Sequence, residues 1–395
     1  MKQGWEYKKL GEVCTIERGG SPRPITDYIT DSEDGINWIK IGDAQEGSKY
    51  ITSTKEKIRL EGLKKSRFVH KGDFILSNSM SFGRPYILKV DGCIHDGWLV
   101  IHDDKEVFIK DYLYYILSSP IMYAKFSQLA VGGVVNNLNS SLVRKVTIPL
   151  PPKSTQLTIV SELDKINELI RLKKEQLKDY DNLAQSIFYE MFGDPVENDK
   201  GWEVKELGQL CEVTSSKRVF INEVVDAGVP FIRGTELTAL NKLVPGEKMH
   251  YTLFITQEHY ERLKAITGVP KVGDLLIPSI NADGIVWMVD TEEPLYFKDG
   301  RVLWIHVNHN HFNSIAIQKL MNILIKNIYA SMGGATFAEL KLFVLRNMKV
   351  PIPPLSVQNA FAEKIKRIDI QKLQVKKSIT DLETLLASRM QYWFE

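Results

Sequence analysis

Polar side chains at predicted turns and strand ends are the residues of this chain best suited to recognition chemistry. Arginine, lysine, asparagine and serine make the hydrogen bonds that distinguish base pairs in the DNA major groove. In the first half of the chain these candidates are Arg18, Arg23, Lys40, Asn78, Arg84, Asn136, Asn137 and Asn139. In the second half they are Lys217, Arg218, Arg233, Ser279, Asn281 and Lys341. The alternative for each is an ordinary solvated side chain, because 25% of the chain is charged.

The net charge does not by itself favour a polyanionic partner. It is only +2 at pH 7, so a nucleic acid would have to be bound by local patches. Lysine and arginine recur between Lys55 and Lys71, and this stretch has the charge to bind phosphates.

Catalytic motifs are incomplete. The paired prolines of IPLPP (148–152) and PIPPL (351–355) resemble the amine-holding motif of adenine methyltransferases, but no Asn or Asp precedes them. No glycine-rich loop stands between a strand and a helix to take a methyl donor. We interpret both motifs as a strand end followed by a helix start, where proline costs no hydrogen bond.

A nuclease centre is equally weak. Asp194 with Glu203 and Lys205 gives an acid and E-x-K spacing for metal-assisted hydrolysis, but the equivalent Glu6 and Lys8 have no acid upstream. The histidines of HVNHNH (306–311) could meet at a metal, yet no acid or cysteine cluster stands nearby, so we expect a loop. We predict no catalytic residue, no metal site and no cofactor site in this chain, and no enzyme activity of its own.

Length and composition indicate an ordinary globular chain. Its 395 residues, 44% hydrophobic, suffice for two or three domains. The start lacks an apolar signal-peptide core, and no apolar run is long enough to span a membrane. Three cysteines without CxxC spacing suit a reducing compartment, so we expect a cytoplasmic protein.

An internal repeat spans the chain. GWEYKKLGEVC (4–14) returns about 200 residues later as GWEVKELGQLC (201–211), and KGDFIL (71–76) returns as VGDLLI (272–277). The segments between these landmarks, such as 19–34 and 215–227, hardly resemble each other. One scaffold therefore carries two different surfaces, which suggests two different targets.

Each copy of the repeat ends in a long helix. Apolar residues recur every third and fourth position at Ile159, Leu163, Ile166, Ile170, Leu177, Tyr180, Ala184, Ile187 and Met191, interrupted by Lys173. The second copy gives Phe361, Ile365, Ile368, Val375, Ile379, Leu382, Leu386 and Trp393, interrupted by Lys372 and Arg389. Two matched seams predict an intramolecular coiled coil. We expect antiparallel pairing, because it lets each domain stay near the start of its own helix.

The fold class follows from the remaining segments. WIKI (38–41), DFILS (73–77), WLVI (98–101), FIR (231–233) and VLWIHV (302–307) predict short strands, and 112–117 and 315–329 predict helices. We predict an α+β protein with two similar domains, each a twisted and mainly antiparallel sheet with helices, related by a pseudo-twofold axis. The expected divisions are a domain at 1–152, a spacer helix at 153–195, a domain at 196–354 and a second spacer helix at 355–395.

This organisation resembles the specificity subunit of type I restriction-modification systems. The resemblance covers the whole chain. It rests on the domain-helix-domain-helix order, the proline motifs followed by Gln156 and Gln358, the KGD and VGD turns, and MFGDP (191–195) after the first helix.

The resemblance implies a non-catalytic subunit with two target-recognition domains, each reading one half of a split, asymmetric site in double-stranded DNA. The helices would set the spacing and dock two methyltransferase subunits, which methylate adenine with S-adenosylmethionine. As many as two restriction subunits, motor-nucleases that use ATP and magnesium, can join. Two alternatives stay open: a protein-protein scaffold that reads no DNA, and a self-contained nuclease.

Overall fold

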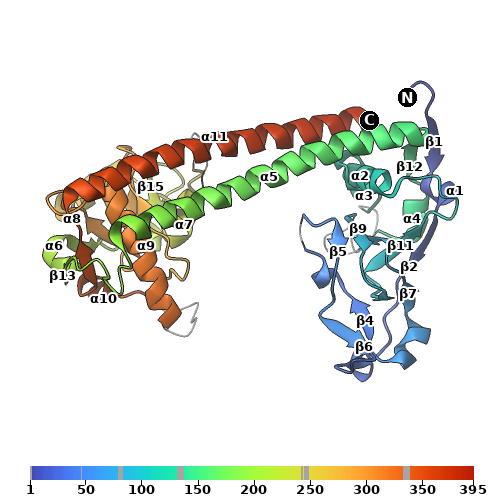
Figure 1. Ribbon diagram of the computed structural model, residues 1–395, viewed down its shortest axis with the longest axis horizontal. Coiled ribbons are helices and arrows are strands. Elements are labelled where there is room, and N and C mark those ends of the chain that lie inside the picture. The colour runs from blue at the N-terminus through green and yellow to red at the C-terminus, as the bar shows by residue number, and fades with distance from the viewer. Residues whose placement is uncertain are drawn as a thin grey trace. The chain divides into compact units, whose positions relative to one another are not determined.

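The computed structural model describes residues 2–45, 47–78, 83–130, 138–241, 243, 249–331 and 339–395. These residues form two compact units (Figure 1). The first comprises Met1–Leu172 and Ile379–Glu395, and the second comprises Lys173–Ser378. Two helices of 40 residues each, α5 (Lys153–Phe192) and α11 (Leu355–Phe394), each contribute one segment to both units.

The first unit contains two five-stranded sheets and a two-stranded one. Their strand orders are β3-β6-β4-β10-β7, β2-β11-β8-β9-β5 and β1-β12. The strands are β1 (Glu6–Lys9), β2 (Thr15–Arg18), β3 (Ile29–Thr30), β4 (Ile36–Ile39), β5 (Tyr50–Ile51), β6 (Glu56–Ile58), β7 (Arg67–Val69), β8 (Phe74–Ser77), β9 (Pro85–Leu88), β10 (Gly92–Ile94), β11 (Trp98–His102) and β12 (Thr147–Leu150). The helices are α1 (Leu10–Val13), α2 (Lys110–Ser118), α3 (Pro120–Ala130) and α4 (Ser140–Arg144), with short 3-10 turns at Ile25–Asp27, Ile41–Asp43 and Leu60–Lys65.

The second unit repeats this plan, with fewer strands among its described residues. Its sheets are β14-β20-β17-β18, β16-β15-β19 and β13-β21. The strands are β13 (Glu203–Glu206), β14 (Glu212–Ser215), β15 (Val229–Ile232), β16 (Phe254–Ile255), β17 (Leu275–Pro278), β18 (Trp287–Met288), β19 (Tyr296–Phe297), β20 (Val302–His306) and β21 (Lys349–Ile352). The helices are α6 (Leu207–Leu210), α7 (Gly234–Leu240), α8 (Gln257–Thr267), α9 (Ser314–Ser331) and α10 (Leu342–Arg346), with a 3-10 turn at Ile221–Glu223.

The central strands of each unit are apolar on both faces because they separate two cores. In β11, Leu99 and Ile101 pack into the core beneath the helices, whereas Trp98 and Val100 pack into a smaller core on the opposite face. Strand β20 divides its residues in the same way between two cores of the second unit. The alternation of side chains along a strand therefore places one helix-covered core and one outlying core in each unit.

The two long helices run antiparallel. In the first unit, Glu162 of α5 pairs with Arg389 of α11 and accepts a hydrogen bond from the Trp393 indole at 3.0 Å. In the second unit, Lys372 of α11 pairs with Asp181 of α5 at 2.5 Å. As the residue numbers rise along α5 they fall along α11, which confirms the predicted pairing. Lys372 and Arg389, the expected polar interruptions of the seam, are thus neutralised by acids on the partner helix.

The ends of both long helices leave the seam and enter a domain core. Phe188 and Phe192 at the end of α5 are buried in the core of the second unit, where both rings contact Phe361. Met390 and Phe394 at the end of α11 are buried in the core of the first unit. The seam periodicity did not predict these four residues, because the helix end faces a domain rather than the partner helix.

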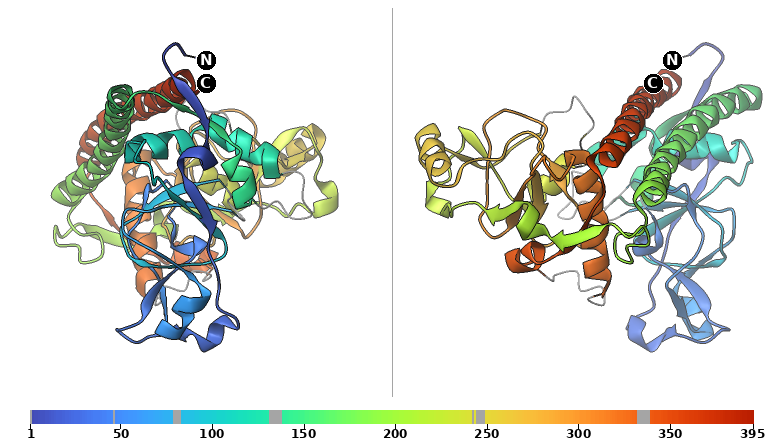
Figure 2. Two further views of the ribbon diagram at one scale, coloured as in Figure 1. Left: turned by 90° about the vertical axis from the view of Figure 1, so that its right-hand side faces the viewer. Right: turned by 60° about the vertical axis from the view of Figure 1, so that its left-hand side comes forward.

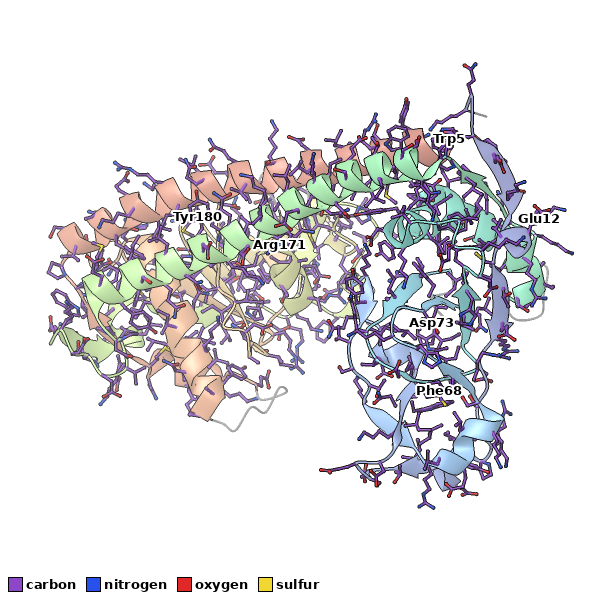
Figure 3. The ribbon with its side chains drawn as sticks, turned by 45° about the vertical axis from the view of Figure 1, so that its right-hand side comes forward. Trp5, Glu12, Phe68, Asp73, Arg171 and Tyr180 are labelled. Carbon is purple, nitrogen blue, oxygen red and sulfur yellow. The ribbon has the colours of Figure 1, made fainter. Side chains whose placement is uncertain are left out.

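The start and end of the chain meet in the first unit (Figure 2). The Lys2 ammonium lies 4.9 Å from the Trp5 ring, 4.5 Å from the Tyr392 ring and 5.2 Å from the Trp393 ring. Trp5, which is labelled in Figure 3, lies just before β1. Its ring stacks on that of Trp393, with ring centroids 6.3 Å apart. This packing attaches the first strand to the last helix.

The structure confirms the α+β class, the two sheet-rich domains and the pair of long helices. The five predicted strands correspond to β4, β8, β11, β15 and β20. Among the strand pairings of the described residues, twelve are antiparallel and three are parallel. Both proline motifs mark a strand end and a helix start, at β12–α5 and β21–α11. Among the described residues, no helix has the length and apolar character needed to cross a lipid bilayer.

Candidate nucleic-acid interface

A tight turn, His95–Gly97, links the two five-stranded sheets of the first unit. It follows β10, which belongs to one sheet, and precedes β11, which belongs to the other. The Trp98 N–H donates to the His95 carbonyl at 3.1 Å, and the Gly97 N–H donates to His95 Nδ1 at 2.8 Å. These hydrogen bonds fix the conformation of the turn, so side chains from neighbouring loops can bind to it.

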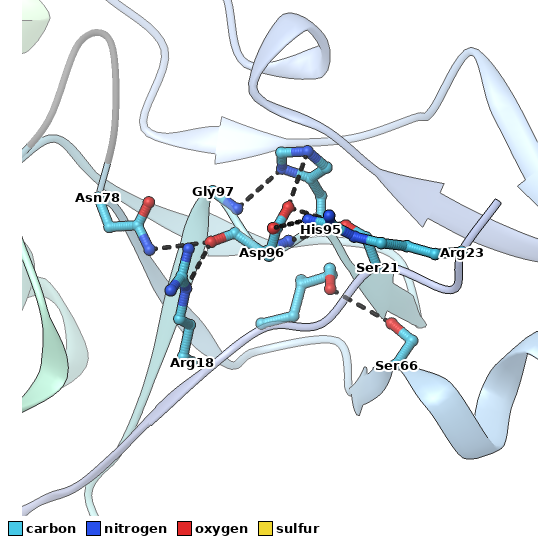
Figure 4. A network of polar contacts seen from close by, with 9 residues as sticks. Arg18, Ser21, Arg23, Ser66, Asn78, His95, Asp96 and Gly97 are labelled. Atoms are coloured by element: carbon cyan, nitrogen blue, oxygen red, sulfur yellow. Dashed lines mark hydrogen bonds and ion pairs between the residues drawn. The ribbon is translucent and has the colours of Figure 1, made fainter. Parts of the chain in front are cut away.

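Asp96, in the middle of this turn, gathers three of the predicted DNA-binding side chains (Figure 4). Its main-chain carbonyl accepts hydrogen bonds from Arg18 Nε at 2.9 Å and from Asn78 Nδ2 at 3.0 Å. Its carboxylate lies 3.5 Å from Arg23 Nη2 and accepts the Ser21 hydroxyl at 2.8 Å. One residue thus connects the end of β2, the loop that follows it and the end of β8.

The charges around Asp96 determine its protonation. Burial raises the pKa of this carboxyl, but the Ser21 hydroxyl and the nearby His95 and Arg18 outweigh that effect and hold the pKa below its ordinary value. The pKa of His95 is lowered, chiefly by burial and further by the cations Lys40 and Arg18, although Asp96 opposes the shift. The cluster therefore presents an ionised carboxylate and a neutral imidazole at neutral pH.

Lys40 stands beside the same turn. Strands β4 and β10 are parallel neighbours, and the His95 N–H donates to the Ile39 carbonyl at 3.1 Å. Lys40 therefore follows its strand at the edge where the turn lies, and its ammonium pairs with Glu56. A hollow of about 430 Å³ lies among these groups and is lined by Ser21, Pro22, Arg23, Ile25, Ile29, Trp38, Lys40, Glu56, His95 and Asp96.

The second unit has a counterpart of this turn, Lys298–Gly300, between β19 and β20. The Lys298 N–H donates to the Ile232 carbonyl at 2.9 Å, which repeats the bond between His95 and Ile39. The carboxylate of Asp299 accepts a hydrogen bond from Arg218 Nε at 3.2 Å. Arg218 lies in the loop after β14, as Arg23 lies in the loop after β2. Both domains therefore hold a loop arginine on an aspartate of the same turn.

Arg233 occupies the place of Lys40, directly after the strand that pairs in parallel with the turn's own strand. Its guanidinium donates to both carboxylate oxygens of Glu236, at 3.1 and 2.6 Å. Burial alone raises the pKa of Glu236, but the hydrogen bonds from Arg233, from the Thr235 hydroxyl and from the backbone lower it to about 2.

Three predicted residues are buried and hold loops instead of presenting their side chains. Asn78 is 3% exposed, and among the described residues its Oδ1 has no hydrogen-bond partner. Ser279 is 1% exposed and occupies the equivalent place in the second unit. The Leu138 N–H donates to the main-chain carbonyl of Asn78, and the Leu340 N–H donates to that of Ser279. The Asn281 amide is 3% exposed and bonds both the N–H and the carbonyl of Ile285. The structure therefore does not support direct contact between these side chains and bases.

The remaining predicted residues lie elsewhere. Asn139 caps α4, since its Oδ1 accepts the Leu142 N–H at 3.0 Å, and Lys341 stands at the equivalent start of α10, paired with Glu339. Arg84 is exposed, and Lys217 is an exposed neighbour of Arg218. Asn136 and Asn137 lie outside the described residues. The structure therefore brings Arg18, Arg23, Lys40 and Asn78 together in one domain, and Arg218 and Arg233 flank the corresponding turn in the other.

The sequence search missed the two aspartates that organise these clusters. Acidic residues were not considered for binding to a polyanion. A signal was present nevertheless, because HDG (95–97) and KDG (298–300) are each followed by a buried strand containing tryptophan. In the part of the chain that the structure describes, no group of three or more His, Cys, Asp or Glu residues could hold a metal ion.

The two units are related α+β domains that carry different cationic loops on one scaffold, which is the organisation expected of a sequence-recognition protein. The family model for the type I restriction modification DNA specificity domain matches residues 2–179 and again residues 199–384. The chain therefore belongs to this family, as the sequence motifs indicated. Membership places it among DNA-specificity proteins rather than enzymes.

Two known type I specificity subunits are similar to this chain over nearly its full length. The type I restriction enzyme MjaIX specificity subunit of Methanocaldococcus jannaschii is 24% identical over 98% of this chain and 91% of that protein. The MjaVIII specificity subunit of the same organism is 21% identical over 98% of this chain and 92% of its own.

Solved structures show the same fold. A chain from a structure of assembly and conformational transition in the type I restriction-modification system has a TM-score of 0.64 at 17% identity, covering 99% of this chain and 97% of its own. The S subunit of a type I system from M. genitalium has a TM-score of 0.50 at 15% identity, covering 100% and 98%.

Proposed function

We propose that this chain is the subunit that selects the DNA sequence for a type I restriction-modification complex. Residues 1–152 and 196–354 act as two target-recognition domains, each reading one half of a split, asymmetric site. The observation that carries the proposal is the duplicated turn: Asp96 and Asp299 stand at equivalent places, yet they hold loops of different sequence. One scaffold with two loop chemistries suits a site whose halves differ.

The chemistry of the clusters fits base reading. Arg23 and Arg218 are 82% and 69% exposed, and each has guanidinium N–H donors beyond those facing its aspartate. Arginine paired with guanine O6 and N7 is the commonest specific contact in the major groove. Phosphates would be bound by lysines of the 55–71 stretch and of the neighbouring loops.

The partners follow from the family. Two methyltransferase subunits would dock on the long helices and supply S-adenosylmethionine chemistry, and as many as two restriction subunits would bring ATP and magnesium. Exposed apolar residues on α5 and α11, including Leu157, Leu169, Leu183, Ile370 and Leu385, offer a surface for such docking. This chain would contribute sequence choice alone.

The proposal is tested by selecting bound duplexes from a fully randomised library, using the full chain together with its methyltransferase. Wild type should enrich a two-part sequence with a fixed gap. Arg23→Ala should relax one half and Arg218→Ala the other, so each variant is the control for its counterpart. A single direct contact is worth about 1–3 kcal/mol, which makes the change visible at one position. Enrichment of no sequence by wild type would favour the scaffold alternative, and cleavage or methylation by the isolated chain would contradict the recognition role.

A further inference from the structure

An acid on a DNA-binding surface requires an explanation. Asp96 and Asp299 have side chains 29% and 22% exposed, and both stand beside the cations assigned to DNA. A carboxylate near a phosphate backbone repels it, so neither acid can serve phosphate binding. An aspartate stands at the same place in both domains, which indicates a function common to both half-sites.

Neither carboxylate is required to form its turn. In the first domain the turn is closed by the hydrogen bonds from Trp98 N–H to the His95 carbonyl and from His95 N–H to the Ile39 carbonyl. In the second, Val302 N–H donates to the Lys298 carbonyl at 3.1 Å, and Gly300 N–H donates to the Ser215 hydroxyl at 3.0 Å. The main-chain hydrogen bonds that close each turn thus do not involve the carboxylates, which face the arginine loops.

The Asp96 carboxylate accepts the Ser21 hydroxyl at 2.8 Å and lies 3.1 Å from His95 Nε2 and 3.5 Å from Arg23 Nη2. The Asp299 carboxylate accepts a hydrogen bond from Arg218 Nε at 3.2 Å. Both arginines have most of their surface in solvent. An exposed arginine samples many rotamers, and fixing it on DNA costs conformational entropy. A carboxylate that already holds one edge of the guanidinium reduces this cost and leaves its other N–H groups directed outward. The arrangement resembles the supporting contacts that hold a recognition side chain in a productive geometry.

From this geometry we infer that Asp96 and Asp299 are positioning residues for sequence choice: each orients one loop arginine, Arg23 or Arg218, toward a base of its own half-site. The inference rests on the proposed function and adds to it the residues that set the direction of the reading side chains. Asp96 and Asp299 themselves need not touch DNA.

The substitution Asp96→Asn isolates the carboxylate. The Asp96 carbonyl that accepts Arg18 and Asn78 is main-chain, so those contacts remain in the variant. The amide of asparagine is nearly isosteric and can still accept the Ser21 hydroxyl, but it has lost the charge that holds Arg23. Asp299→Asn makes the same change opposite Arg218.

The test is a library selection with the full chain and its methyltransferase, comparing wild type, Asp96→Asn and Asp299→Asn. Each variant should lose about tenfold preference at one position of one half-site and keep the other half. Binding to unselected random duplex should strengthen, because one negative charge has left the surface. A merely structural role would instead weaken binding to every duplex.

A double-mutant cycle makes the assignment specific. If Asp96 acts through Arg23, then Asp96→Asn should change the selected sequence no further in an Arg23→Ala background. A further change of the selected sequence in the Arg23→Ala background would overturn the inference. So would an unaltered sequence preference in both Asn variants while wild type still selects a split site. Either result would leave the proposed function standing. Failure of wild type itself to select a sequence would reject the proposed function instead. Thermal unfolding of each variant identifies any that fails to fold. If an Asn variant does not fold, Arg23→Lys or Arg218→Lys tests the same orientation, because lysine keeps the positive charge but lacks the planar guanidinium.

Discussion

Gln156 and Gln358 make the same set of hydrogen bonds in the two domains. Gln156 Oε1 accepts the Ile109 N–H at 2.7 Å, and its amide donates to the carbonyls of Val107 and Pro151, both at 3.0 Å. Gln358 accepts the Asn313 N–H at 2.9 Å and donates to the carbonyls of His311 and Pro353, both at 2.8 Å. Each buried amide joins the first turn of a long helix to the loop before the domain's helices.

Replacing either glutamine by leucine should destabilise its own domain. The change leaves an N–H and two carbonyls unpaired, and an unsatisfied buried group costs about 1–3 kcal/mol. We expect denaturant unfolding of Gln156→Leu and Gln358→Leu to begin at lower concentration than that of wild type. Gln371→Leu, the same substitution at an exposed position of α11, is the control and should change the midpoint little.

Alanine at two equivalent glycines should have unequal effects. A Cβ at Gly11 would lie 2.8 Å from Arg144 Cβ and 3.2 Å from its Cα, whereas a Cβ at Gly208 would approach Arg346 no closer than 3.2 Å. Overpacking costs about 1–3 kcal/mol, while alanine gains up to about 1 kcal/mol of helix propensity. Gly11→Ala should therefore lower the melting temperature and Gly208→Ala should leave it nearly unchanged. Equal losses would show that the two helix contacts are not as different as the distances indicate.

Phe394 should stabilise the first domain more than any neighbour in the last turn of α11. Its side chain is 4% exposed and its ring centroid lies 5.8 Å from that of Tyr112. Phe394→Ala should cost about 3–5 kcal/mol, as large-to-small core changes do. Tyr392→Ala removes an adjacent aromatic that is 55% exposed and should cost less than about 1 kcal/mol. Limited proteolysis of the first domain would report the difference directly.

The ion pair of Glu236 should give the second domain an acid-sensitive component. The pKa of Glu236 in the folded chain is about 2, below the ordinary 4.5, so ionisation stabilises the fold above about pH 5 and the stabilisation is lost as the pH falls toward 2. On the order of 2 kcal/mol should disappear between about pH 6 and about pH 3. Glu236→Gln should lower stability at neutral pH and flatten this dependence. The assignment would be contradicted if the free energy of unfolding changed by the same amount between the two pH values in wild type and in Glu236→Gln.

The long helices should set the gap between half-sites. Deleting one heptad from each, residues 168–174 and 370–376, keeps the seam in register and removes about 10 Å of helix. The selected half-site sequences should persist while the gap contracts by at most about 3 base pairs. Deleting the heptad from α5 alone misaligns the two seams and is the control that should fail to form the pair. Selection of the original gap by the shortened chain would reject this role.

Sequence patterns predicted the repeat, the main strands and the helix seams because each depends on local periodicity or on similarity between segments. The aspartate turns were missed for a different reason. Asp96 makes its contacts with Arg18, Ser21 and Asn78 only after β2, β8 and β11 have paired. Likewise, the amide chemistry of Asn139 and Asn281 suits base reading as well as capping, and only the folded chain shows which hydrogen bonds they make. Asn136 and Asn137 stay predictions.

The placement of Met390 and Phe394 in the core of the first domain has a consequence for synthesis on the ribosome. Residues 1–152 emerge first, yet part of their core is translated only after the entire second domain. At about 5–20 residues per second, the first domain must wait more than about ten seconds with an open apolar surface. The second domain, whose core is closed by α5 and the beginning of α11, is completed earlier. The domain that leaves the ribosome first is thus the one whose core is completed last.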